Sequence, residues 1–195
     1  MASDRGDGRQ ARSALSRQRI IEAAIQLATE QGLEPTADRV AELAGITPRT
    51  VFRHFEDMEA LQREIFADFQ AQSEALRVSF DPQRFWREQL DELVIRRTGI
   101  FERHTRHLLY AQAMRLNSSV VEADVQAYFQ RMRKSLKQRL PAEFVSERSA
   151  FAAVEAVLGW ELWLRLRRDQ KLSVKQARAV VQNLVDAVLA QQGLR

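Results

Sequence analysis

Residues 37–56, ADRVAELAGITPRTVFRHFE, restrict the fold more than any other segment, because they fit two short helices that cross at a tight turn. A close crossing needs a small residue on the first helix, and Ala41 supplies it. The turn needs a residue that tolerates a positive φ angle, and Gly45 follows. Thr47 is then a suitable N-cap for the second helix, whose Val51 can pack against Ala41. The pattern predicts a compact pair of helices.

The rest of the chain also has the pattern of helices. It contains 7 glycines and 4 prolines, so few residues interrupt helices, and no alternating β-branched run predicts a strand. Apolar residues recur at helical spacing from 16 to 31, and a long helix is predicted from Asp57 to about Ser79. Beyond Pro82 the predicted helices span residues 83–104, 106–116, 119–140, 146–169 and 173–192. The expected fold class is therefore all-α.

We expect three regions along the chain. Residues 1–15 are small, polar and basic, which predicts a disordered basic arm. Residues 16–60 are predicted to form an N-terminal three-helix head that contains the helix-turn-helix. Residues 61–195 are predicted to form an α-helical body, joined to the head by the long helix.

The head resembles a known family. Residues 19–61 resemble the DNA-binding head of TetR-like bacterial transcriptional regulators. The matching features are the alanine-rich first helix ending in Gly32, Thr36 ahead of Val40 and Ala41, the run Ala44-Gly45-Ile46, and Phe52 and Phe55 ahead of Leu61. The resemblance implies a sequence-specific DNA-binding regulator with an all-helical body that binds a small ligand and dimerises.

Two positions depart from the family pattern. Phe52 stands where the family usually has tyrosine, and Met58 stands where it usually has lysine. In relatives both positions often contact backbone phosphates, so those two contacts are in doubt here. We expect the phosphate contacts to be rebuilt from Arg53, His54 or the basic arm.

The second helix of the pair carries the candidate contacts to DNA. Val51 and Phe55 are expected to face inward, which turns the remaining side chains outward. An arginine there, Arg49, can donate to guanine O6 and N7 together. The candidate DNA-binding residues are Thr36, Thr47, Arg49, Thr50, Phe52, Arg53 and His54.

The body carries two further candidate surfaces. The helix predicted over 146–169 is apolar on nearly every side, and the last helix has a wide apolar stripe, a pattern that favours burial on more than one face. The resemblance implies dimerisation through these two helices. The candidate dimerisation residues are Phe151, Leu158, Trp160, Leu164, Val180, Leu184 and Val188.

Aromatic and sulfur-containing residues cluster earlier in the body. Each of them is explained most simply as core, but as a group they can line an apolar cavity with a few polar anchors. The candidate ligand-binding residues are Trp86, Phe101, His104, Tyr110, Met114 and Phe129. We expect a hydrophobic or amphipathic effector that releases a repressor from its operator.

Several other kinds of function are not expected. The chain has no cysteine and no phosphate-binding glycine loop, so we predict no enzyme and no cofactor. His104 and His107 share a helix side, but a third metal ligand is not evident. No secretory signal or apolar span is expected, which favours the cytoplasm and no membrane partner. The expected partners are a double-stranded DNA operator, a small-molecule effector and a second copy of the chain.

Three alternatives stay open from the sequence. One is a constitutive DNA binder that senses no ligand. Another is a helical interaction protein that has lost DNA binding, which the departures at Phe52 and Met58 allow. The third is an enzyme with a helical fold.

Overall fold

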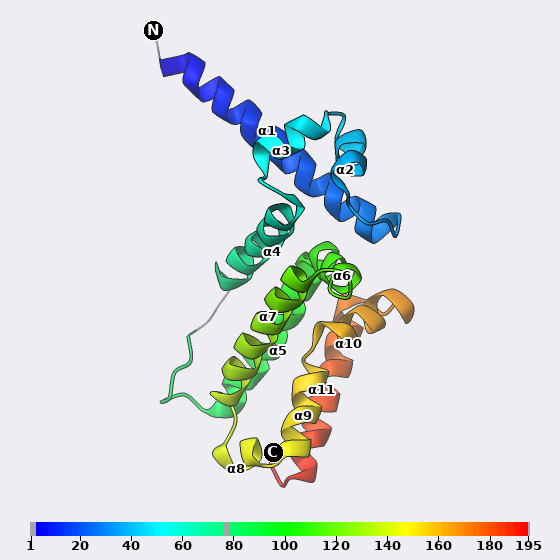
Figure 1. Ribbon diagram of the computed structural model, residues 1–195. Coiled ribbons are helices and arrows are strands. Elements are labelled where there is room, and N and C mark those ends of the chain that lie inside the picture. The colour runs from blue at the N-terminus through cyan, green and yellow to red at the C-terminus, as the bar shows by residue number, and fades with distance from the viewer. Residues whose placement is uncertain (1–2, 76–78, 195) are drawn as a thin grey trace. The chain divides into compact units, whose positions relative to one another are not determined.

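The computed structural model describes residues 3–75 and 79–194 and confirms the all-α fold (Figure 1). Within these ranges the secondary structure is helical, with no strand. The chain divides into two compact units: Met1–Gln70 with Leu109–Val125, and Ala71–Leu108 with Gln126–Arg195. This division places residues 61–70 and 109–125 with the head, whereas the predicted body began at residue 61.

The head begins with α1 (Ser3–Glu30), followed by α2 (Ala37–Ala44), α3 (Pro48–His54) and α4 (Met58–Ala75). Helix α2 packs on α1 and on α3, and in Figure 1 both short helices lie beside α1. The core between them is made of fully buried apolar side chains, including Ile20, Ala24, Val40, Val51 and Leu61.

The turn between α2 and α3 has the predicted geometry. Gly45 ends α2 with a φ of 67°, the left-handed conformation that favours glycine. The Ile46 N–H then donates to the Ala41 carbonyl at 2.9 Å. Ala41 is 1% exposed and Val51 is 0% exposed, as the crossing requires. The Thr36 and Thr47 side chains cap α2 and α3.

The predicted disordered arm is wrong for the described part of residues 1–15. Residues 3–15 are the first turns of α1, which is 28 residues long. The second half of α1 is fixed by packing, so each added residue extends an existing helix without the cost of nucleation. Ala11, Arg12 and Ala14 are good helix formers, and Arg12 Nε donates to the Gly8 carbonyl at 3.0 Å one turn earlier.

The second unit contains α5 (Trp86–Arg103) and the C-terminal helices. These are α8 (Ala142–Ser146), α9 (Arg148–Val157), α10 (Trp160–Leu164), a π-helical turn η1 (Arg165–Asp169) and α11 (Val174–Gln191). Helices α6 (Thr105–Met114) and α7 (Ser119–Lys137) each contribute residues to both units. Helix α11 packs on α9 and α5. In the core, the rings of Tyr128 and Trp160 stack with centroids 5.4 Å apart.

The single helix predicted over 146–169 is broken at Gly159. The Gly159 N–H donates to Ala156, and its backbone is extended, so α9 ends and α10 begins there. A Cβ at this position would lie 2.9 Å from Glu161 Oε2 and 3.1 Å from the Ala156 carbonyl oxygen. This break explains why the sequence over 146–169 is apolar on nearly every side of a single predicted helix. Helices α9 and α10 are separate, and each buries its own face.

Candidate nucleic-acid interface

The outer face of α3 presents the residues predicted to contact DNA. Arg49 and Arg53 are exposed, whereas Val51 is buried in the head. Neither arginine forms a hydrogen bond or ion pair with another residue in the described parts of the chain. Both guanidinium groups are therefore available to an external anion or base edge.

The threonines at the start of the two helices have capping roles as well. Thr36 Oγ1 accepts from the Arg39 N–H at 3.5 Å, and Thr47 Oγ1 accepts from the Thr50 N–H at 3.3 Å. The Thr47 and Thr50 hydroxyls also lie 3.1 Å apart. Thr36 and Thr47 are exposed and Thr50 is half-buried. A contact from any of the three to DNA would add to these internal bonds.

A residue that the sequence did not indicate, Arg17, holds the end of α3. Its guanidinium donates to both Glu64 carboxylate oxygens, with Nε 2.6 Å from Oε1, and Nη1 donates to the His54 carbonyl. The same guanidinium lies over the Phe55 ring, 4.2 Å from its centroid. Arg17 thus ties α1 to α4 and to the last turn of α3, and the Glu64 carboxylate raises the pKa of Arg17.

His54 lies half-buried at the C-terminal end of α3. Burial lowers the pKa of His54, and the neighbouring charges of Arg53 and Arg17 lower it further. Its Nε2 atom is buried and has no hydrogen-bond partner among the described residues. A neutral imidazole is therefore favoured in the folded head at neutral pH.

A groove runs between the early part of α1 and the end of α3. Its lining is polar and basic, and its volume is about 430 Å³. The lining residues are Arg12, Ser13, Ser16, Arg53 and His54. Two of the predicted DNA-binding residues, Arg53 and His54, therefore share a surface with the segment predicted as a basic arm.

The two departures from the family pattern lie at the margins of this face. Phe52 is 50% exposed beside Arg53 on α3. Met58 is half-buried as the first residue of α4, where Asp57 Oδ1 accepts from the Ala60 N–H at 2.6 Å. Neither side chain can give a phosphate the hydrogen bond of the tyrosine or lysine it replaces.

The predicted ligand-binding residues are split between the two units. Trp86, Phe101, His104 and Phe129 belong to the second unit, and Tyr110 and Met114 belong to the first. None of these six residues lines the groove between α1 and α3. The buried Tyr110 hydroxyl has no hydrogen-bond partner in the described ranges, and burial raises the pKa of Tyr110.

The predicted dimerisation residues fall into two groups. Phe151, Leu158, Trp160 and Leu164 are 1–6% exposed and pack inside their own unit. The three residues of α11 differ, because they lie along the edge of its buried face: Leu184 is 40% exposed, and Val180 and Val188 are half-buried. The sequence pattern could not separate the groups, since both are apolar and helical.

Among the described residues, no group of three or more acidic, histidine or cysteine side chains is arranged to hold a metal ion. None of the helices described has the length and apolar character needed to cross a membrane.

Comparison with known proteins finds a family model that matches the head of this chain. Residues 20–65 match the model for the N-terminal region of "Bacterial regulatory proteins, tetR family". No curated protein sequence matches the chain.

Two solved structures share the fold over most of the chain. One, from Rhodococcus sp., is described as a TetR-family transcriptional regulator, with 16% identity and a TM-score of 0.62, covering 89% of this chain and 98% of that one. The other is the multidrug binding protein EbrR complexed with imidazole, with 23% identity and a TM-score of 0.52, covering 86% of this chain and 88% of that one. At these identities the likeness concerns the fold.

Proposed function

We propose that this chain, a TetR-like protein in its head and in its fold, is a sequence-specific DNA-binding transcriptional regulator. The observation that carries the proposal is the outer face of α3. Arg49 and Arg53 project from a helix whose other side is locked into the head, and neither is neutralised by another described residue. A helix of this kind enters the major groove, where arginine reads guanine.

The groove between α1 and α3 supports a rebuilt phosphate contact. Arg12 and Arg53 supply two cations, and Ser13 and Ser16 supply hydroxyl donors to one hollow. Phosphate contacts hold a protein in register on the duplex, and arginine and serine make them readily. This groove would replace the contacts that Phe52 and Met58 cannot make.

We further propose a two-fold dimer that uses the exposed edge of the apolar face of α11. The exposed Leu184, with the half-buried Val180 and Val188, forms an apolar stripe that a second copy would cover. Light scattering tests this: a dimer at micromolar concentration supports it, and a monomer refutes it. Leu184→Glu should favour the monomer, whereas Asn183→Glu, on a neighbouring exposed position, should change less.

We also propose that a small effector releases the protein from its operator, which would make it a ligand-sensing repressor. The buried Tyr110 hydroxyl supports it, because this hydroxyl has no hydrogen-bond partner among the described residues, and a ligand can supply one. If the effector weakens the protein's affinity for DNA, then bound DNA must weaken the protein's affinity for the effector by the same factor. Calorimetry with and without operator tests this, and equal affinity would leave a constitutive binder.

A non-enzymatic role in the cytoplasm, with double-stranded DNA as partner, completes the proposal. The direct experiment is a mobility-shift titration of the full chain on duplex from upstream of its own coding sequence, beside a scrambled duplex of equal composition. We expect a shift that favours the native duplex and weakens with salt. No shift, or equal binding to both duplexes, would contradict sequence-specific regulation.

A further inference from the structure

The outer side of α3 carries an apolar ring beside its two arginines, and we call Arg49, Phe52 and Arg53 together the recognition face. Phe52 is 50% exposed, whereas Phe55, which ends the same helix, is 3% exposed and lies under the Arg17 guanidinium. The core of the head therefore uses Phe55 and leaves much of the Phe52 ring outside. A benzyl ring has no hydrogen-bond donor or acceptor, so the contact it makes with a partner is apolar.

The spacing along α3 puts Phe52 beside Arg49. Residues three or four positions apart are neighbours on one side of a helix, so Phe52 and Arg53 both adjoin Arg49. Val51 points the other way and is 0% exposed. At about 1.5 Å of rise per residue, Phe52 lies roughly 4.5 Å beyond Arg49 along the axis, and successive base pairs are about 3.4 Å apart. The two side chains therefore reach base pairs that are one or two steps apart.

The charges around the ring favour a polyanion as the partner of the recognition face. Helix α3 contains two arginines and no acidic residue. Neither arginine is bound by another residue in the described ranges, and Arg53 also lines the groove shared with Arg12. A second copy of the same face would bring like charges together, which is unfavourable. DNA instead offers phosphates to the arginines and base edges to the ring.

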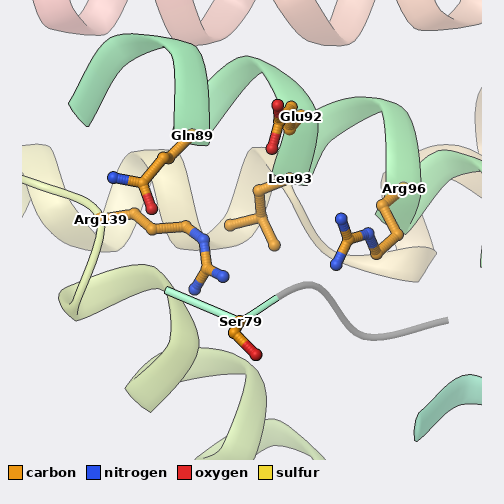
Figure 2. A pocket seen from close by; sticks show the side chains of 6 residues that line it. All are labelled: Ser79, Gln89, Glu92, Leu93, Arg96 and Arg139. Atoms are coloured by element: carbon orange, nitrogen blue, oxygen red, sulfur yellow. The ribbon is translucent and has the colours of Figure 1, made fainter. Parts of the chain in front are cut away.

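Cationic side chains also line a small hollow in the second unit, but a carboxylate offsets them there. The hollow is lined by Ser79, Gln89, Glu92, Leu93, Arg96 and Arg139 (Figure 2). Figure 2 shows the Ser79 hydroxyl pointing away from the Arg96 and Arg139 guanidinium groups. The space cannot hold a water molecule. The recognition face differs, because it is open to a large partner and has no carboxylate on its helix.

Thymine is the base that an apolar ring in the major groove can recognise. Its 5-methyl group is apolar, whereas the major-groove edges of guanine, cytosine and adenine present hydrogen-bond donors and acceptors. A benzyl ring over those polar atoms would remove their water without replacing its hydrogen bonds, which is unfavourable. Contact between the ring and the methyl group removes apolar surface from water, which is favourable. The ring therefore discriminates in favour of thymine.

We propose that Phe52 is a specificity-determining residue that contacts the 5-methyl group of a thymine, one or two base pairs from the guanine expected to be read by Arg49. The inference rests on the proposed function, because it names a base that the recognition helix of the regulator reads. It also gives the departure from the family pattern at position 52 a role. The ring gives up the phosphate bond of a tyrosine and makes an apolar contact with a base.

The test replaces single thymines by deoxyuridine, which removes only the methyl group. The probe is a duplex carrying the motif that the full chain enriches from a random pool, titrated by mobility shift. Uracil at the thymine near the guanine should weaken binding by roughly fourfold, the effect of exposing one methyl group. Phe52→Ala should bind the thymine and uracil duplexes equally. Leu33→Ala is the matched control, since Leu33 is 39% exposed between α1 and α2, and it should keep the difference.

The uracil duplex leaves the protein unaltered, and Phe52→Gln, which should also lose the difference, replaces Phe52→Ala if that variant folds poorly. Equal affinity of the wild type for the thymine duplex and for every uracil duplex would overturn this inference alone. A difference that persists in Phe52→Ala would assign the methyl contact to another side chain, such as Thr50, and would overturn it too. A chain that enriches no motif would overturn the proposed function together with the inference.

Discussion

Replacing Arg17 by alanine should loosen the recognition helix without unfolding the second unit. The substitution removes the bidentate pair with Glu64, the bond to the His54 carbonyl and the contact with the Phe55 ring. The side chains of Arg17 and Glu64 are 40% and 32% exposed, so each of these interactions is discounted for solvent screening. Together we expect them to contribute about 2 kcal/mol to the docking of α3.

Hydrogen exchange read by mass spectrometry measures this docking directly. A loss of about 2 kcal/mol should speed exchange of the amides in residues 49–55 by roughly 30-fold, since about 1.4 kcal/mol is tenfold. Exchange in α11 should stay unchanged. Arg19→Ala is the matched control, because Arg19 is exposed on the same helix and has no bond to another described residue. Unchanged exchange in Arg17→Ala, or an equal rise in Arg19→Ala, would refute the role we give to Arg17.

Three further predictions concern the proposed interface. Arg49→Ala should cost about 1–3 kcal/mol on the specific duplex and much less on scrambled DNA; equal loss on both would make Arg49 a phosphate contact. Met58→Lys should tighten binding and steepen the log–log salt dependence by up to about one counterion, and an unchanged slope would place residue 58 away from DNA. Because burial lowers the pKa of His54, the unfolded chain binds its proton more readily, so the head should lose stability as pH falls below about 6.5. The loss should be smaller in His54→Asn, and an identical pH profile by thermal unfolding would exclude His54 as its source.

The sequence predicted the α2–α3 pair well because its determinants are local. A positive φ at Gly45, a threonine cap at Thr47 and a small residue at Ala41 each act over a few neighbouring positions. The break at Gly159 was missed, since an apolar run predicts a continuous helix until steric contacts with Glu161 are known. Local patterns predict helices and turns, but they give no contact distances.

The parts of the candidate site that were missed depend on residues distant in sequence. Arg17 and Glu64 are 47 positions apart, and neither lies in a sequence motif that predicts an ion pair. The exposed side of α11 could likewise be told from its buried side only once its neighbours were placed, as Leu184 and Val185 show.

Selection of binding sites from a pool of random duplexes tests the central claim most directly. The full chain would be incubated with the pool, bound duplexes recovered, and the enriched sequences compared with those recovered by Arg49→Ala. We predict one near-palindromic motif whose half-sites lie one helical turn apart, about 34–36 Å, with guanine preference lost in the variant. A recovered pool with no shared motif would contradict sequence-specific recognition by this chain.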